Sequence, residues 1–382
     1  MCPTGSRPAS PSKDAGADKD AAPCKQECPC AKITAINIVS VEFVSDHNLL
    51  KNYNTDWKSG GVRFPKPEWT PAAQFPVSHS MDKQVEIKLT IEVLPANACP
   101  ETGKIRGEAP DGLVFEEASH TFSPGKQTIS LKSAQKLPKK VNVMDFRIAW
   151  TTTGTSVSIS PSATVNKMYV TYDTPYNDTP FENDVTEKRL AWVCGLCKGD
   201  TNGHDSVKKI HDSTGTYDLS SSTPSPHWKI AGGAHAQCMD LSNFYMLAAE
   251  MLGLRTGVIV YLFPQIGKTT KESTNSSDSQ RRPVSSSHAA STTHNSFNPN
   301  EKIALLDFSQ GWNNYEACFK FTHPDSTGTS KTRYYAGGAD IYDSKEEVMK
   351  AVCQRTEWVW QSSQNGWSNC KDPGPSPAEV WK

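Results

Sequence analysis

The sequence predicts a multidomain α+β protein, with an N-terminal antiparallel β-sandwich followed by a second domain that mixes helices and strands. Its 382 residues amount to about 2.5 times the length of a typical domain. Between residues 33 and 172, short runs alternate apolar and polar side chains without helical periodicity, which is typical of a sandwich. After a proline-rich segment at 175–180 the periodicity becomes helical, so a second domain is expected to begin there.

Residues 1–31 are predicted to be a flexible tail. Pro, Ala, Ser, Asp and Lys dominate this segment, so it buries too little apolar area to offset the entropy lost on ordering. Cys24, Cys28 and Cys30 lie near its end, at a spacing too tight for a tetrahedral metal site and without a fourth ligand nearby. We therefore expect these cysteines to be oxidisable or disulfide-bonded rather than metal-bound.

Residues 32–174 are predicted to form the sandwich domain. Segments 36–44 and 85–93 show the period-two alternation of half-buried strands. Further strands are expected at 127–131, 141–150 and 167–172. This half of the chain carries no pattern of catalytic residues, so we expect it to recruit a protein partner or a substrate.

The composition excludes two classes of partner. With 40 Lys and Arg residues against 41 Asp and Glu, the chain exerts no long-range attraction on nucleic acid. No stretch approaches the roughly 18 consecutive apolar residues of a membrane span. The start of the chain lacks the basic and apolar regions of a conventional signal peptide, which predicts either a cytoplasmic protein or export by a non-classical or specialised secretion system.

Residues 175–382 are predicted to form the second domain, and four helices are expected in it. Three of them are placed at 181–197, 205–211 and 344–361, the last behind a Ser-x-x-Glu capping box. The fourth begins near Cys238, because apolar residues recur from there at three- and four-residue steps. Gly253 stands where a glycine commonly ends a helix.

Cys238 is the candidate nucleophile of this domain. The dipole and the unpaired N–H groups at a helix start favour negative charge, so a thiol there ionises more readily, and thiolate is the reactive form. The odd number of cysteines, 11, also requires at least one thiol that does not pair within the chain. A base and a carboxylate that orients it are expected at His294 and Asp307, on neighbouring strands.

Residues 267–293 form a long insertion, rich in Ser and Thr, that leads into His294. A loop of this length inside a domain is either a lid or disordered, so we expect it to be mobile and to lie over the site. His288 in this loop is a rival for the role of base. His323 and Asp325 form another pair, but they occupy a turn-like segment and are expected to be structural.

The surroundings of Cys238 carry a family resemblance. A glycine-rich approach precedes it, its helix closes in Leu-Gly-Leu-Arg, and an apolar strand and then His294 and Asp307 follow. These features, spread over about 180–320, resemble the transglutaminase-like branch of the papain-like cysteine enzymes. Gln237-Cys238 is similar to the Gly-Gln-Cys motif of transglutaminases, although alanine stands where that motif has its glycine and methionine where it has tryptophan.

The resemblance implies a papain-like, transglutaminase-like α+β fold and a thioester mechanism without a cofactor. Cys238 then resembles the nucleophile, His294 the general base and acid, and Asp307 the orienting carboxylate. The backbone N–H of Cys238 is the expected first oxyanion donor, with Gln237 or Trp228 as the second.

The substrate implied is a peptide, protein or glutamine amide. A peptidase, an amidase, a deamidase and a transglutaminase all follow from this chemistry, and the sequence leaves the choice among them open. By analogy of architecture alone, the chain also fits a secreted toxin or effector. The alternative is a non-catalytic binding or structural protein whose transglutaminase-like domain is inactive.

The second domain also contains four residues of the kinds that bind zinc, which are Cys194, Cys197, His204 and His211. Their spacing differs from that of a standard zinc finger. We favour the simpler interpretation that the two cysteines pack in the core at a helix end or form one disulfide. No metal is therefore expected in this domain.

Overall fold

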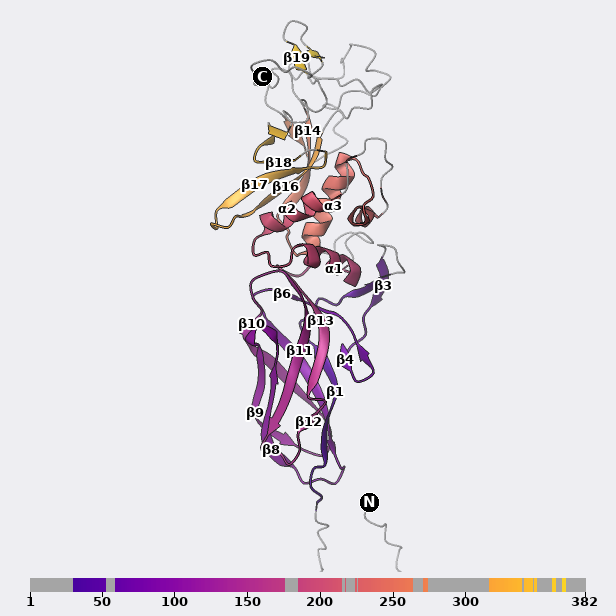
Figure 1. The fold of residues 1–382 in the computed structure, drawn as a ribbon, viewed down its shortest axis with the longest axis vertical. Coiled ribbons are helices and arrows are strands. Elements are labelled where there is room, and N and C mark those ends of the chain that lie inside the picture. The colour runs from indigo at the N-terminus through magenta and orange to yellow at the C-terminus, as the bar shows by residue number, and fades with distance from the viewer. Residues whose placement is uncertain are drawn as a thin grey trace, which may run out of the picture.

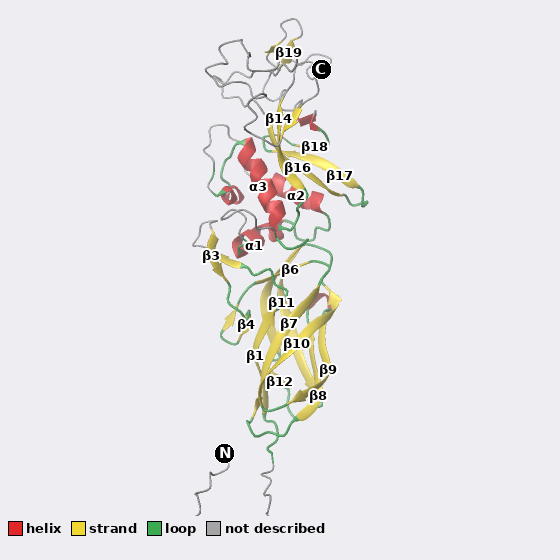
Figure 2. Cartoon of the chain, turned by 180° about the vertical axis from the view of Figure 1, so that it is seen from behind, coloured by secondary structure: helices red, strands yellow, loops and turns green. Residues whose placement is uncertain are grey.

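The computed structural model is a mixed α/β structure made mostly of strands, with few helices (Figure 1). A large curled sheet occupies one end of the molecule, and the helices lie between it and a smaller sheet (Figures 1 and 2). The structure describes residues 30–52, 59–175, 185–214, 217, 224, 226–263, 271–273, 316–338, 340–345, 347–348, 359–361 and 366–368.

Eleven strands form the large sheet. They are β1 (Ala35–Phe43), β4 (Trp69–Thr70), β5 (Ala73–Gln74), β6 (Val77–Ser80), β7 (Gln84–Leu94), β8 (Glu101–Glu108), β9 (Val114–Phe122), β10 (Gly125–Lys136), β11 (Asn142–Thr153), β12 (Ile159–Ser160) and β13 (Ala163–Thr171). Their order is β5-β4-β1-β7-β10-β9-β8-β11-β13-β6, with β12 paired to β1. The pairs β1–β12 and β13–β6 are parallel, and the others are antiparallel. A separate hairpin joins β2 (Leu50–Asn52) to β3 (Ser59–Arg63).

The strands predicted by alternation are present. Segments 36–44 and 85–93 correspond to β1 and β7, and the other three overlap with β10, β11 and β13. Strands β8 and β9 were not predicted, because β8 has only Ile105 as a buried apolar side chain and β9 only Phe115 and Phe122. Such sparse apolar positions produce no alternation that a sequence reading can detect.

The large sheet curls until its two halves face one another. Along the sheet, β1 and β11 are separated by four other strands, yet the rings of Phe43 and Phe146 are 6.1 Å apart. The halves are joined through β10, which pairs with β7 over Gly125–Lys132 and with Phe115 of β9 at Ser133. The strands therefore form one continuous sheet, whereas the expectation was a sandwich of two.

The remaining part of the chain holds the helices and the smaller sheet. The helices are α1 (Glu187–Leu196), α2 (Gly203–Ser213) and α3 (Cys238–Met251), with the short 3-10 helix η2 (His227–Gly232). A second 3-10 helix, η1 (Pro110–Gly112), joins β8 to β9 in the large sheet. The smaller sheet has the antiparallel order β15-β14-β16-β17-β18. Its strands are β14 (Gly257–Phe263), β15 (Lys271–Ser273), β16 (Glu316–Pro324), β17 (Ser330–Ala336) and β18 (Ile341–Tyr342). Within the described ranges, no helix is long and apolar enough to cross a membrane.

The first two predicted helices differ from the observed ones at their starts. Helix α1 begins only at Glu187, because Leu50 of β2 pairs with Thr186 and holds that residue extended. Thr186 then caps the helix by accepting a hydrogen bond from the N–H of Arg189. Helix α2 begins at Gly203, two residues earlier than predicted, with Asn202 as its cap.

Helix α3 agrees with the prediction at both ends. It begins at Cys238, and Gly253 just beyond it has a φ of 78°, the left-handed conformation in which glycine is favoured. A Cβ at Gly253 would also lie 2.2 Å from the backbone oxygen of Asp173. The connection from α3 to β14 is thus packed directly against the chain that follows β13.

The predicted C-terminal helix is only partly present. At its start, Ser344 Oγ accepts a hydrogen bond of 3.2 Å from the N–H of Glu347, as a capping box requires. At its end the prediction is wrong, because Val359–Gln361 form β19, paired with β20 (Gly366–Ser368). Trp360 and Trp367 are register partners in this hairpin, and aromatic residues are enriched in strands.

The large sheet and the helices share one continuous core. Buried apolar residues of both parts, among them Phe43 of β1 and Phe244 of α3, belong to a single contiguous cluster. At the junction the N–H of Tyr172 donates to the backbone oxygen of Leu252 (2.9 Å), and the Tyr172 hydroxyl donates to that of Asn202 (2.6 Å).

Candidate functional site around Cys238

Cys238 is the first residue of α3 and is 1 % exposed. The chain reaches this point through η2 and Gly233, whose φ of 90° permits the turn before the helix. Gln237 is the N-cap residue, in an extended conformation and without a side-chain cap to the helix within the described residues. The backbone N–H groups of the first turn are therefore directed toward the site, as a developing negative charge requires.

The Cys238 side chain faces the smaller sheet. It forms a small buried cluster with Tyr261 of β14 and Ala317 of β16, and the partly buried Tyr217 and Met239 pack against this cluster. The surroundings are thus apolar side chains of α3, β14 and β16, with the helix N-terminus as the polar element.

Asp240 and His227 form a pair on another side of the same helix turn. Nε2 of His227 lies 3.3 Å from Oδ1 of Asp240, and Asp240 is 1 % exposed. Because successive helix residues are about 100° apart, Asp240 projects roughly 200° around the axis from Cys238. This pair was missed by the sequence analysis, although an acidic residue in the first turn of a helix was a signal.

His294, Asp307 and the rival His288 lie outside the described residues. The segment that contains them connects β15, which ends at Ser273, to β16, which begins at Glu316. Of the insertion predicted at 267–293, residues 271–273 form β15 and pair with β14, which corrects the expectation of a wholly mobile loop. The rest of that range lies outside the described residues.

The two predicted oxyanion residues occupy different environments. Gln237 is at the N-cap, adjacent to the thiol in the chain. Trp228 is fully buried, with its ring 5.4 Å from that of Phe244 and the Arg189 guanidinium 5.3 Å from its centroid. Trp228 therefore packs α3 against α1.

Cys194, Cys197, His204 and His211 do not come together as a zinc site. His204 hydrogen-bonds through Nδ1 to the Tyr335 hydroxyl at 3.0 Å, while the ring of His211 lies 5.2 Å from that of Tyr245. Across the described part of the chain, no group of three or more His, Cys, Asp or Glu residues is placed to hold a metal ion.

Cys194 and Cys197 are buried at the end of α1 and do not form a disulfide. Burial raises the pKa of the Cys194 thiol well above its usual value and that of Cys197 to about 12. Both thiols therefore stay protonated, as core cysteines do.

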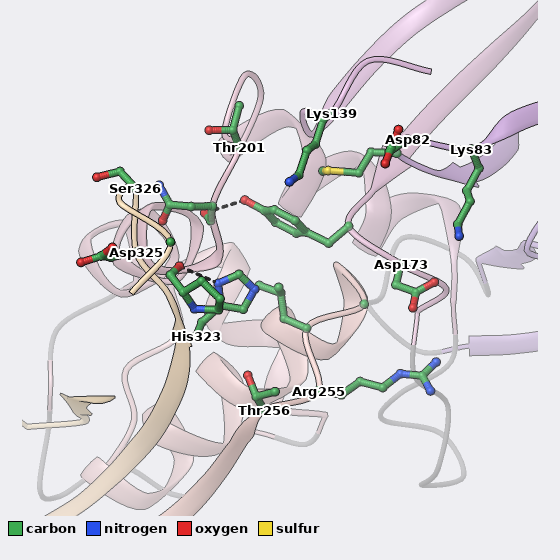
Figure 3. Close-up of a pocket in the computed structure, with 17 residues that line it drawn as sticks. Asp82, Lys83, Lys139, Asp173, Thr201, Arg255, Thr256, His323, Asp325 and Ser326 are labelled. Atoms are coloured by element: carbon green, nitrogen blue, oxygen red, sulfur yellow. Dashed lines mark hydrogen bonds between the residues drawn. The ribbon is translucent and has the colours of Figure 1, made fainter. Parts of the chain in front are cut away.

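A cavity lies at the other end of α3 from Cys238. It has a volume of about 860 Å³ and is lined by the β6–β7 turn, the end of β13, the α3–β14 connection and the β16–β17 turn. Figure 3 shows Lys139 and Asp82 on one side of it and Arg255 and His323 on the other. A helix of 14 residues is about 21 Å long, so this cavity is not part of the thiol site.

His323 and Asp325 line this cavity and have structural contacts. The Asp325 carboxylate accepts hydrogen bonds from Thr327 and Thr329, and these hold its pKa below the usual value. The His323 ring stacks on Phe321 with a centroid distance of 5.5 Å. These contacts agree with the structural role expected from the turn-like segment.

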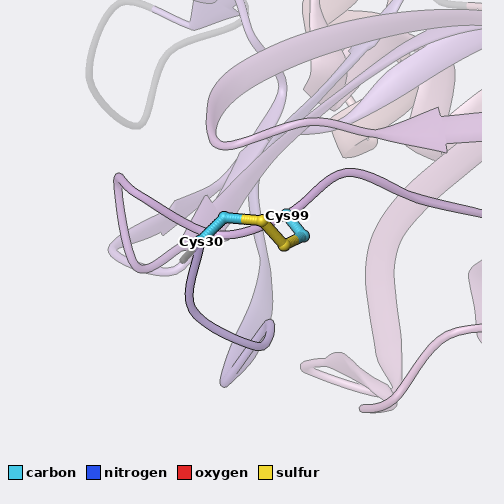
Figure 4. The surroundings of a disulfide bond; sticks show 2 residues. All are labelled: Cys30 and Cys99. Carbon is cyan, nitrogen blue, oxygen red and sulfur yellow. A yellow bond between two sulfur atoms is a disulfide. The ribbon is translucent and has the colours of Figure 1, made fainter. Parts of the chain in front are cut away.

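A disulfide joins Cys30 to Cys99, in the connection between β7 and β8 (Figure 4). Beside it, Ala31 pairs with Ala98 as a parallel bridge. Residues 30 and 31 therefore belong to the folded part of the chain, which corrects the end of the predicted tail. The expectation that tail cysteines form disulfides is confirmed for Cys30, whereas Cys24 and Cys28 lie outside the described residues.

A comparison of the chain with protein-family models and with curated proteins finds no match.

Proposed function

We propose that this chain is a cysteine-dependent acyl-transfer enzyme that acts on peptide, protein or glutamine amides, with Cys238 as its nucleophile. The observation that carries the proposal is the position of this thiol, at the first residue of a buried helix and against a sheet. Helix N-termini lower the pKa of a cysteine by stabilising the thiolate. The resemblance to transglutaminase-like enzymes supports the same role.

In this mechanism the Cys238 thiolate attacks the carbonyl carbon of the amide, forming a C–S bond. The tetrahedral oxyanion accepts hydrogen bonds from the Cys238 N–H and from Gln237, since Trp228 is packed between α1 and α3. The C–N bond then breaks, and His294 delivers the proton that it took from the thiol to the departing nitrogen. Water or an amine next attacks the thioester, the C–S bond breaks, and the thiol is regenerated.

The direction in which Cys238 faces supports a base from the 274–315 segment. The thiol side of α3 meets β14 and β16, and this segment leads directly into β16. Of the ten histidines, only His288 and His294 lie outside the described residues, and several others contact different groups, such as His204 with Tyr335. His288 and His294 remain as candidates, and we propose His294 as the base and Asp307 as its orienting carboxylate because of the family resemblance.

The N-terminal strands are proposed as a recruitment module. In this division, the predicted 1–31 tail and 32–174 sandwich-like domain meet at residue 30 instead of 32, because Cys30 and Ala31 are tied to the strands, and 175–382 is a transglutaminase-like catalytic domain. The surface of the strands carries ion pairs of both signs, such as Arg106 with Glu116 and Lys132 with Glu86, which suits a protein partner rather than a polyanion. Delivery as a secreted toxin or effector fits this architecture.

A second candidate function is that of a non-catalytic binding protein. The observation in its favour is the depth of Cys238, at 1 % exposure, beneath Tyr261 at 8 %. A substrate amide reaches the thiol only if these side chains move. Thiol reactivity therefore distinguishes an enzyme from an inactive relative of one.

The deciding experiment is alkylation with iodoacetamide at pH 6, followed by mass spectrometry of the Cys238 peptide. An ordinary thiol is almost wholly protonated at this pH, so rapid labelling of the wild type indicates an activated thiolate. We expect no label in Cys238→Ala and at least about ten-fold slower labelling in His294→Ala. Cys318→Ala, which removes a buried thiol from β16, serves as the matched control and keeps the wild-type rate.

The same proteins are then incubated with a glutamine-containing protein and an amine, while ammonia release, cleavage and amine incorporation are followed together. Cleavage identifies a peptidase, ammonia alone a deamidase or amidase, and incorporation a transglutaminase. Wild-type labelling no faster than that of an unfolded thiol, with no turnover, overturns the enzyme proposal and supports the binding protein. His235 lies three residues before Cys238 in the chain. If His235→Ala slows labelling and His294→Ala does not, the assigned base is wrong.

A further inference from the structure

Gly337 lies directly against the start of α3. It follows the last residue of β17 and is buried. A Cβ added at Gly337 would be 1.9 Å from the backbone oxygen of Cys238 and 2.6 Å from both its carbonyl carbon and its Cα. All three are backbone atoms, so a side chain at this position cannot be accommodated by a change of rotamer.

The close approach is held by hydrogen bonds to a single carbonyl group. The backbone oxygen of Ala317 in β16 accepts from the N–H of Gly337 at 3.0 Å and from the hydroxyl of Ser242 in α3 at 2.8 Å. Ala317 itself packs against Cys238. Three elements, α3, β16 and the end of β17, are thereby fixed around the residue that carries the thiol.

We infer that Gly337 is a positioning residue for Cys238: its lack of a side chain sets the distance between the start of α3 and the smaller sheet. This inference rests on the proposed function, because the position matters for a nucleophile that must meet a base from the sheet side. Gly337 acts through the backbone of Cys238 and touches no substrate. A methyl group there pushes the first turn of α3 away from β16 and carries the thiol with it.

The test is Gly337→Ala, studied in the full chain by the pH profile of Cys238 alkylation from pH 5 to 9. Misplacement of a reacting group by about 1 Å can cost on the order of 100-fold in rate. We expect the labelling rate at pH 6 to fall by about that factor, and the profile to move toward that of an ordinary thiol near pH 8.5. A merely structural role would lower the melting temperature but leave this profile unchanged.

Gly195→Ala is the matched control. Gly195 lies in α1, and a Cβ there meets no atom within 4 Å, so we expect the wild-type alkylation profile. If Gly337→Ala does not fold, Ser242→Ala tests the same positioning of α3 against β16 with a smaller structural change. It removes one of the two donors to the Ala317 carbonyl and is expected to slow labelling at pH 6 by about five-fold, the effect of one hydrogen bond.

The outcomes separate this inference from the proposed function. If Cys238 in the wild type is alkylated at pH 6 no faster than an unfolded thiol, the proposed function itself is refuted. An activated wild-type thiol with the same pH profile in folded Gly337→Ala overturns the positioning role while leaving the enzyme proposal intact. If Gly337→Ala is unfolded, an unchanged profile in Ser242→Ala overturns it equally.

Discussion

Nε2 of His227 lies 3.3 Å from Oδ1 of the buried Asp240, two residues beyond Cys238 in the chain. The contact has the distance of an ion pair without the alignment of a hydrogen bond. A buried carboxylate is destabilising unless a positive charge or a donor is nearby. We therefore expect His227→Ala to lower the free energy of unfolding by about 1–3 kcal/mol, measured by urea denaturation.

The control is the same substitution in an Asp240→Asn background. Once the carboxylate charge is removed, the loss of His227 should destabilise the protein much less. The double-mutant cycle then yields a coupling energy of about 1 kcal/mol or more. Additive effects of the two substitutions would contradict the ion pair.

Acid should destabilise the protein through a histidine pair at the end of the large sheet nearest the helices. Nδ1 of His47 lies 2.8 Å from Ser78 Oγ, and the rings of His47 and His79 are 6.3 Å apart. Burial lowers the pKa of His47 to about 4 and that of His79 to about 3. Burial also raises the pKa of the neighbouring Asp46 to about 6.

The lowered histidine pKa values and the raised Asp46 pKa have opposite effects on how stability depends on pH. Below about pH 6.5 the histidines bind protons in the unfolded chain but not in the folded one, so stability falls as the pH falls. Asp46 binds its proton in the folded state first, so between about pH 6 and 4 it offsets one of the two histidines. The net expectation is a loss of about 1 kcal/mol per pH unit over this range.

Urea unfolding at pH 7, 6, 5 and 4 measures this slope. The variant His79→Leu should fold, because a leucine can pack against Phe43, whose ring lies 5.9 Å from that of His79. The slope of its free energy of unfolding against pH should be smaller than that of the wild type by about 1 kcal/mol per pH unit. The same slope in both proteins would mean that His79 does not contribute.

Replacing Gly253 should weaken the junction between α3 and the large sheet. Its φ of 78° disfavours any other residue, and a Cβ would lie 2.2 Å from the backbone oxygen of Asp173. We expect Gly253→Ala to lower the free energy of unfolding by at least about 2 kcal/mol, measured by chemical denaturation. Gly195→Ala is again the comparison, and it should stabilise the protein slightly as helical Gly→Ala changes do.

Removal of the Cys30–Cys99 disulfide should also destabilise the fold. The bridge closes a loop with a sequence separation of 69 residues. Loop entropy of this size corresponds to about 4 kcal/mol. We expect Cys99→Ser to lose much of this amount in urea denaturation, and wild-type protein kept in reductant to lose a similar amount. No difference between the oxidised and reduced wild type would show that the bridge is not formed in solution.

The predicted elements that proved right have strong local signals. In β7 every second residue from Val85 to Val93 is buried, so the alternation visible in the sequence is the alternation of the strand. Helix α3 has an apolar stripe and a glycine at its end, and Cys238 was therefore placed correctly at its first residue. The end of the C-terminal helix was wrong because Val359–Gln361 pair as a strand with Gly366–Ser368, and local helical periodicity does not encode this pairing.

By itself, the sequence determined the types and the order of the main elements and the position of Cys238 at a helix start, because these depend on neighbours within a few residues. Only the tertiary structure decided that the strands join in one curled sheet, with Phe43 against Phe146. It also decided that Gly337, which is distant in the sequence, lies directly against the backbone of Cys238. Such contacts depend on how distant segments pack, and packing at this density is sensitive to single atoms that no local pattern records.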